Sequence, residues 1–158
     1  MTEIMEGIRI CIGHRGVYWA EIVTTGRVAH GSMPFLGVSA VEPMAAIVER
    51  LRTELRPALA ARVTVMPVVP SGARHATLNV NTIEGGQSGQ AGQTPCVPDR
   101  CRLVVDRRFL LEESLDDVRQ ELRDVLDTTL SLFPGVEYRL EDRLVVVPVQ
   151  TADEAPVV

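Results

Sequence analysis

The order of local patterns along this chain constrains its fold more than any other feature. Two segments, 38–55 and 115–132, carry apolar residues at steps of three and four, the period of one helix face. Four segments have strand composition: 17–25, 76–84, 102–110 and 136–141. The resulting order, strand, helix, strand, strand, helix, strand, predicts an α+β two-layer sandwich. In this ferredoxin-like βαββαβ arrangement, two helices cover one face of a four-stranded antiparallel sheet.

Prolines set the expected limits of these elements. Pro57 predicts the end of the first helix, because the residue before a proline is disfavoured in the α region. Residues 62–69 have strand composition but contain Pro67, so we expect either an extra edge strand or an extended connector there. The tail, residues 148–158, shows no periodicity, and we expect it to be a linker.

Composition argues against several classes of partner. With 158 residues, of which 46% are hydrophobic, the chain can form one globular domain with a core. Its net charge of -5 and 4% aromatic content disfavour a nucleic-acid partner, and no basic cluster is longer than Arg107-Arg108. No apolar run approaches the roughly 20 residues that span a bilayer, so no membrane partner is expected.

The three cysteines point to a reducing compartment. Cys11, Cys96 and Cys101 are odd in number and include no C-x-x-C spacing, which predicts free thiols, with a Cys96–Cys101 bridge as the alternative. No signal peptide opens the chain, so we expect a cytoplasmic location.

One loop has the composition of a functional segment. In 26–34 (GRVAHGSMP), His30 stands among small residues, and glycines at 26 and 31 allow the backbone to turn tightly and approach another molecule. On local composition alone, a structural or incidental role is the plainer interpretation of this lone histidine. The histidines at 14, 30 and 75 share no H-x-x-x-H or H-x-D spacing, so no self-sufficient metal centre is predicted. Asp106 and Arg108 lie on one strand face, where the plain interpretation is an ion pair.

Three motifs taken together resemble a known family. They are HRGVYWAEIVTTGRVAHGSMPFLGVSAV (14–41), TLNVNTIEGG (77–86) and VPDRCRLVVDRRF (97–109). In this order they resemble the lid or dimerisation domain of the zinc-dependent amidohydrolases and metallopeptidases. That family includes acetylornithine deacetylase, succinyl-diaminopimelate desuccinylase, aminoacylase and glutamate carboxypeptidase. The resemblance covers about Arg15 to Val147, nearly the whole chain.

The resemblance implies a division of labour between domains. The family's zinc lies in a catalytic domain into which the lid is inserted, so residues 1–14 and 148–158 would connect to that missing domain and this chain would bind no cofactor itself. The lid dimerises with a second copy through a sheet edge and a helix. The resemblance also implies that the substrates of the whole enzyme are small N-acyl amino acids or peptides.

Site residues carry over by motif position. The resemblance implies that His30 reaches the partner's active site and donates a hydrogen bond to the oxygen that gains charge as water attacks the amide. Gly31 would let this loop lie close to substrate, and Arg108 would bind a substrate carboxylate. Pro95 stands where many members carry a ligand asparagine, so either Gln93 substitutes for it or the contact is lost, and this role is not carried over.

A different class of function stays open on the sequence alone. The chain could be a stand-alone α+β module that dimerises and binds or senses a small molecule. An RNA-binding sheet is disfavoured, because strands 76–84 and 102–110 contain a single aromatic residue, Phe109.

Overall fold

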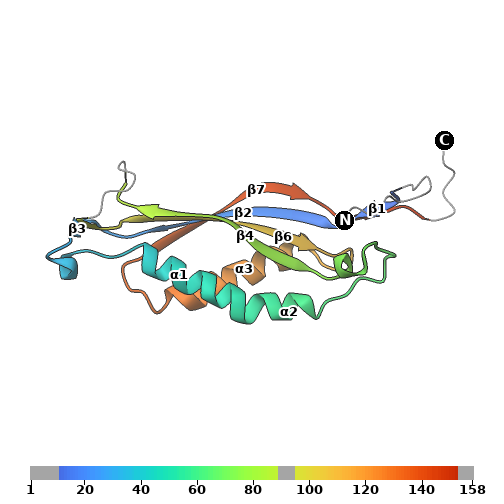
Figure 1. The fold of residues 1–158 in the computed structure, drawn as a ribbon, viewed down its shortest axis with the longest axis horizontal. Helices are drawn as coiled ribbons and strands as arrows, with labels where there is room; N and C mark the ends of the chain where they lie inside the picture. The colour runs from blue at the N-terminus through green and yellow to red at the C-terminus, as the bar shows by residue number, and fades with distance from the viewer. Residues whose placement is uncertain (1–10, 89–94, 153–158) are drawn as a thin grey trace, which may run out of the picture.

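A four-stranded antiparallel sheet with helices on one face forms the body of the protein (Figure 1). A computed structural model describes residues 11–88 and 95–152. The strands are β2 (Gly16–Thr25), β4 (Thr77–Gly86), β6 (Arg100–Phe109) and β7 (Glu137–Val146). Their spatial order is β4-β6-β2-β7, and all neighbouring pairs run antiparallel. The predicted α+β sandwich is confirmed.

The first helix is longer than the sequence predicts. It runs through α1 (Val41–Arg50), a π-helical turn (Leu51–Leu55) and α2 (Arg56–Ala60), so the prediction that Pro57 ends it is wrong. The backbone N–H of Arg56 bonds the carbonyl of Leu51, five residues back. This wider turn directly precedes the proline and relieves the crowding that its ring would cause in a regular α-helix.

The second helix, α3 (Leu115–Leu130), begins at a side-chain cap. Ser114 has extended backbone geometry, and its hydroxyl accepts a hydrogen bond from the backbone N–H of Asp117 at 3.1 Å. Leu132, predicted on the buried stripe, is 72% exposed because the helix ends two residues before it.

The core lies between the helices and the inner face of the sheet. Strand residues such as Tyr18, Ile22 and Leu103 pack there with Ile47 and Leu122 of the helices, all fully buried. Burying one such aliphatic side chain stabilises the fold by about 1.5–3 kcal/mol. Other members of this core include Ala20, Met44, Leu51, Leu59, Val105, Phe109, Val118 and Leu126.

Arg107 also points into this layer, on the opposite face from Asp106 and Arg108, as strand alternation predicts. Its guanidinium is buried and pairs with Glu113 at 2.5 Å. Arg62 contacts the same carboxylate at 2.7 Å. Burial opposes ionisation of Glu113, but the bonds from Arg107 and the Leu110 N–H dominate and lower its pKa.

Two short ribbons extend from opposite ends of the sheet (Figure 1). At one end β1 (Gly13–His14) pairs with β8 (Val149–Gln150), so part of the tail predicted to be a plain connector is a strand. At the other end β3 (Ala29–His30) pairs with β5 (Cys96–Val97), beside a 3-10 turn at Pro34–Leu36.

Residues 62–69 form the connector rather than an edge strand. Their only ladder contact among the described residues is an isolated bridge between Val63 and His75, followed by a 3-10 turn at Ser71–Arg74. Pro67 and Pro70 donate no backbone hydrogen bond, which prevents a continuous ladder. The predicted cysteine state is confirmed: Cys11, Cys96 and Cys101 are all free thiols. Within 11–88 and 95–152 no helix is both long and apolar enough to span a membrane.

Candidate functional site

His30 lies on a tip whose base is closed by backbone hydrogen bonds. The N–H and carbonyl of Arg27 pair with those of Val38 at 2.9 and 2.8 Å, and the N–H of Gly31 donates to the Pro95 carbonyl. A Cβ at Gly26 would overlap the carbonyl oxygen of Val38, so only glycine fits at this crossing. The glycines that the sequence singled out therefore serve close backbone packing.

The hydrogen bonds of the His30 ring define its tautomer. Its Nδ1 lies 2.8 Å from the Ser32 hydroxyl and accepts a bond from the Ser32 backbone N–H at 3.2 Å. Because a backbone N–H can only donate, Nδ1 is an acceptor, and a neutral ring carries its proton on Nε2. His30 is exposed, so its Nε2–H is available as a donor to another molecule.

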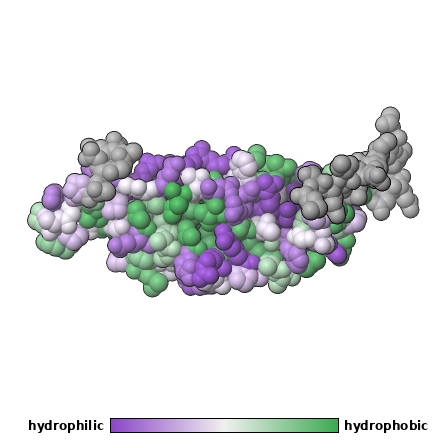
Figure 2. Space-filling view, in the orientation of Figure 1, coloured by the Kyte–Doolittle hydropathy of each residue, from purple (hydrophilic) through white to green (hydrophobic). Residues whose placement is uncertain are grey.

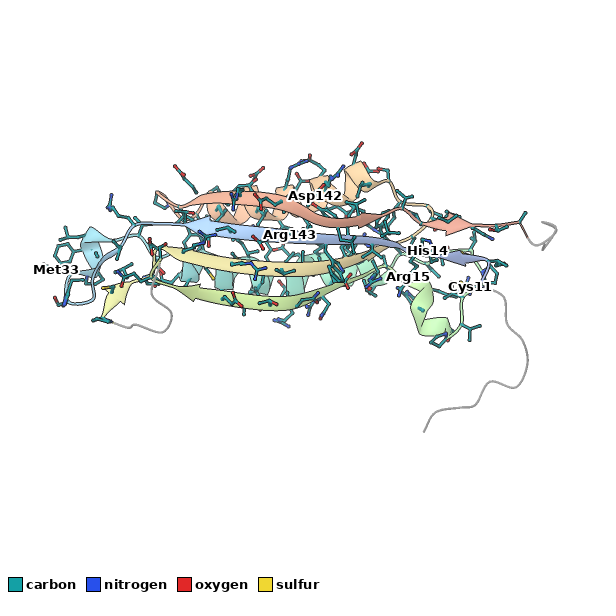
Figure 3. The ribbon with its side chains drawn as sticks, turned by 90° about the horizontal axis from the view of Figure 1, so that it is seen from above. Cys11, His14, Arg15, Met33, Asp142 and Arg143 are labelled. Carbon is teal, nitrogen blue, oxygen red and sulfur yellow. The ribbon has the colours of Figure 1, made fainter. Side chains whose placement is uncertain are left out.

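The tip around His30 is apolar and uncharged. No charged side chain occurs between Val28 and Val41, and Phe35 is 78% exposed at the outer turn, with Met33 exposed beside it (Figure 3). The Met33 N–H donates to the His30 carbonyl at 2.8 Å, which makes the histidine and the turn one rigid unit. A protruding apolar tip of this kind is typical of a surface that contacts a partner.

Arg108 lies at the other end of the sheet. It is opposite Val17 on β2, and Asp106 holds its guanidinium through two bonds of 2.7 and 2.9 Å. The ion pair expected as the plain interpretation is therefore present. Arg15 is part of the same cluster: burial and then the charge of Arg108 lower its pKa. Sequence reasoning missed Arg15, because only the sheet register places the start of β2 beside the end of β6.

His30 and Arg108 do not come together within one chain. Val17, opposite Arg108, is eight residues from Thr25, which corresponds to about 25 Å of extended strand before the tip even begins. Gly31 lies with His30, whereas Gln93 lies outside the described residues. Pro95, at the position of the family's asparagine, contributes only a backbone carbonyl to the loop.

A buried ion cluster stabilises the open face of the sheet between these two ends (Figure 3). The carboxylate of Glu21 is almost fully buried and accepts bonds from Arg143 at 2.5 Å and Arg102 at 2.6 Å. The bonds from Arg143 are the largest cause of its lowered pKa. This cluster links β6, β2 and β7, because Arg102 and Arg143 from the two strands that flank β2 share the Glu21 carboxylate.

No metal-binding group was found in the described part of the chain. Histidine, cysteine, aspartate and glutamate side chains nowhere gather in threes close enough to hold an ion there. His14 lies in β1, His30 on the tip and His75 beside the 62–76 connector. These residues do not fit a zinc centre.

The fold and site together define the class of domain. It is an α+β sandwich with His30 exposed on a tip at one end and the β1–β8 ribbon at the other. Residues 12–132 match the peptidase dimerisation domain family, and the chain belongs to that family.

One curated relative and several solved structures are similar to this chain. A probable carboxypeptidase of Aspergillus terreus is 30% identical over 125 residues, covering 77% of this chain and 27% of the relative. Among solved structures, a hydantoinase/carbamoylase family amidase from Burkholderia ambifaria superposes with a TM-score of 0.68 at 16% identity, over 90% of this chain and 31% of that one. Aminopeptidase PepT from Bacillus cereus superposes with a TM-score of 0.59 at 19% identity, over 90% of this chain and 33% of that one. The chain spans about a third or less of each relative's length.

Proposed function

We propose that this chain is the dimerisation and lid domain of a zinc-dependent hydrolase that cleaves amide bonds in N-acyl amino acids or peptides. The observation that carries the proposal is the exposed Nε2–H of His30 on a rigid, uncharged tip. By itself the chain is inactive, because its role is to complete an active site that another domain holds. Its three free thiols are compatible with the reducing environment of the cytoplasm.

His30 acts as a hydrogen-bond donor to the reacting amide. When water attacks the amide carbon, the carbonyl oxygen gains negative charge, and a donor held ready at that position stabilises it. Ser32 fixes the ring and its tautomer, so little reorganisation is needed during the reaction. Gly31 keeps the backbone beside the histidine narrow enough to enter a cleft.

The two ends of the domain support its insertion into a larger fold. Gly13 pairs with Gln150, and the Thr151 N–H donates to the Ile12 carbonyl at 2.6 Å. The chain therefore enters and leaves the domain side by side. This is the geometry expected of residues 1–14 and 148–158 as paired connectors to one catalytic domain.

The sheet edges differ in their capacity to pair with a second copy. The β7 edge carries five consecutive side chains of which four are charged, Arg139, Glu141, Asp142 and Arg143, and charge protects an edge from pairing. On β4, the segment from Thr77 to Ile83 contains no charged side chain. We assign the dimer contact to β4.

An apolar seam runs along the same side. Ile83 at the β4 edge is 51% exposed, and Val41 and Val48 of α1 are half-buried beside the core. Figure 2, viewed from the β4 side, shows hydrophobic side chains gathered between this edge and α1. Pairing two β4 edges in a two-fold homodimer would bury the seam and satisfy the open backbone groups.

Arg108, with Arg15 beside it, would bind the substrate carboxylate. The cluster has two guanidinium groups and one carboxylate, that of Asp106, so one positive charge remains. Because Arg108 and His30 lie at opposite ends of the sheet, they serve different active sites of the dimer. His30 acts in the partner's site and Arg108 in the site of its own subunit.

The experiment that tests this function replaces His30 in the complete hydrolase. His30→Ala should lower kcat by roughly 10²-fold or more, as the loss of an oxyanion donor does. His75→Ala is the matched control, because the His75 side chain bonds the Ala60 carbonyl at the other end of the molecule. The His75 backbone carbonyl, which accepts a bond from Arg15, is retained in this variant. Unchanged kcat in His30→Ala would remove the histidine from the mechanism, and turnover by the 158-residue chain alone would contradict the lid role.

A further inference from the structure

A shallow pocket on the open face of the sheet, at the end that leads to His30, has a lining suited to an amino acid. We infer that this pocket binds the zwitterion of a free α-amino acid, with Arg100 and Arg139 on its carboxylate and Glu137 on its ammonium group. It is distinct from the His30 tip and from the Arg108 cluster, and its binding can be measured on this chain alone.

The register of three strands builds the pocket. Thr25 of β2 lies opposite Arg100 on β6 and opposite Glu137 on β7, and Val23 lies opposite Arg139. Directly opposed residues in a sheet project from the same face. Thr24 between them is fully buried on the helix side, so this set points to the open face.

The pocket is large enough for a small ligand. It encloses about 300 Å³ and is lined by Val23, Thr25, Arg100, Glu137, Tyr138 and Arg139. This is the lower end of the range for small-molecule sites. Val23 and Thr25 form its floor from the centre of the sheet, while the charged side chains rise from both neighbouring strands.

The arginines of this face differ in how far they are already neutralised. Arg102 and Arg143 are held by Glu21, and Arg108 is held by Asp106. Arg100 makes no ion pair with any residue that the structure describes. Its guanidinium therefore has open donors, and a carboxylate matches their planar fork.

Arg139 and Glu137 complete the match to a zwitterion. Arg139 is 60% exposed and contacts Glu141 at one point, Nε to Oε1 at 3.2 Å, which leaves its terminal nitrogens as further donors. Glu137 has no ion-pair partner in the described residues, although two arginines lie nearby. A lone anion would be repelled by Glu137, whereas an ammonium group one carbon away from the carboxylate would pair with it.

NMR titration of the ¹⁵N-labelled 158-residue chain tests this directly. L-Alanine should produce saturable shifts at the amides of Thr25, Arg100 and Arg139, with a Kd on the order of 1 mM for so small a ligand. N-acetyl-L-alanine, which lacks the ammonium, and L-alaninamide, which lacks the carboxylate, should each bind at least several-fold more weakly. Inorganic phosphate serves as the simple anion.

Variants distinguish specific binding in this pocket from nonspecific electrostatic attraction. Arg100→Gln should abolish the L-alanine shifts. Glu137→Gln should weaken L-alanine but strengthen N-acetyl-L-alanine, because Glu137 no longer repels the carboxylate. Arg52→Gln is the matched control, because Arg52 pairs with Glu49 on an exposed helix face far from the sheet. Absence of saturation by about 50 mM L-alanine, equal shifts in Arg100→Gln, or tighter binding of phosphate than of L-alanine would overturn the proposal. None of these results depends on the activity of His30.

Discussion

His30 lies beyond one end of β2, whereas Arg108 of the same chain is opposite Val17 near the other end, with the buried Glu21 between them. An N-acyl amino acid is far shorter than that strand. Two residues so far apart on one sheet cannot hold the same substrate molecule, so under the proposed function each would serve a different active site.

This separation predicts complementation between two defective subunits. In the complete hydrolase, His30→Ala and Arg108→Gln should each lose most activity as homodimers. A mixed dimer has one active site with both residues intact and one with neither. Random reassociation of equal amounts should therefore restore about a quarter of wild-type activity, since half of the dimers are mixed. Activity that does not rise on mixing would show that the two residues act in one site.

The crowding at Gly26 predicts a loss of stability on replacing it that the uncrowded Gly72 does not share. Gly26→Ala places a methyl group against the Val38 carbonyl, which bonds the Arg27 N–H, so the loop base must shift. Overpacking of this kind costs about 1–3 kcal/mol in the free energy of unfolding. Gly72→Ala should be neutral, because nothing lies within 4 Å of the added atom. Urea denaturation measures the free energy of unfolding of both variants. Equal midpoints for the two would contradict the prediction.

The Glu21 cluster predicts a pH-dependent contribution to stability. The pKa of the Glu21 carboxyl is lowered from its ordinary value of 4.5, so ionised Glu21 stabilises the folded state above that pH. At pH 7, Glu21→Gln should reduce the free energy of unfolding by about 1–3 kcal/mol, towards the lower end because both arginines are partly exposed. The difference should shrink as the pH falls below 4.5 and wild-type Glu21 becomes protonated.

The control for this prediction is Glu54→Gln, which removes an exposed helix pair with Arg50. Its effect on unfolding should stay within about 0.5 kcal/mol at every pH. A difference between wild type and Glu21→Gln that does not change between pH 7 and pH 3 would mean that packing, not charge, explains the variant.

The β4 edge predicts the surface through which two copies associate. The 158-residue chain should sediment as a dimer, and Ile83→Arg should shift it to monomer by placing a charge in the apolar seam. Leu132→Arg replaces a more exposed leucine beyond α3 and should leave the dimer intact. Sedimentation velocity distinguishes the outcomes, and a dimeric Ile83→Arg chain would exclude this seam.

Periodicity predicted the layers of this fold well because each main element buries one face. Apolar residues recur every second position in a strand and every third or fourth position in a helix. This spacing locates the elements, because only one face of each packs against the core. The helix end at Pro57 was mistaken because a single backbone change, the π-helical turn ahead of it, accommodates the ring. Nothing in side-chain composition signals that change.

The candidate site was predictable only where it is local in sequence. The loop around His30 is defined by its own glycines and its uncharged stretch, so sequence reasoning located it. Arg15 beside Arg108, and the pocket between Arg100 and Arg139, arise from strand register. Pairing between β2, β6 and β7 brings together residues that are tens of positions apart in the chain.

The ribbon of β1 and β8 has a mechanical consequence. A single flexible strand would let the domain rotate about its attachment. Two hydrogen-bonded strands form a flat ribbon, which resists twisting and bends mainly perpendicular to its plane. In a lid of the proposed kind, movement of the domain would be confined mainly to one plane. The tip, at the far end of a long lever, would sweep a fixed arc, and His30 would return to the same place on every closure.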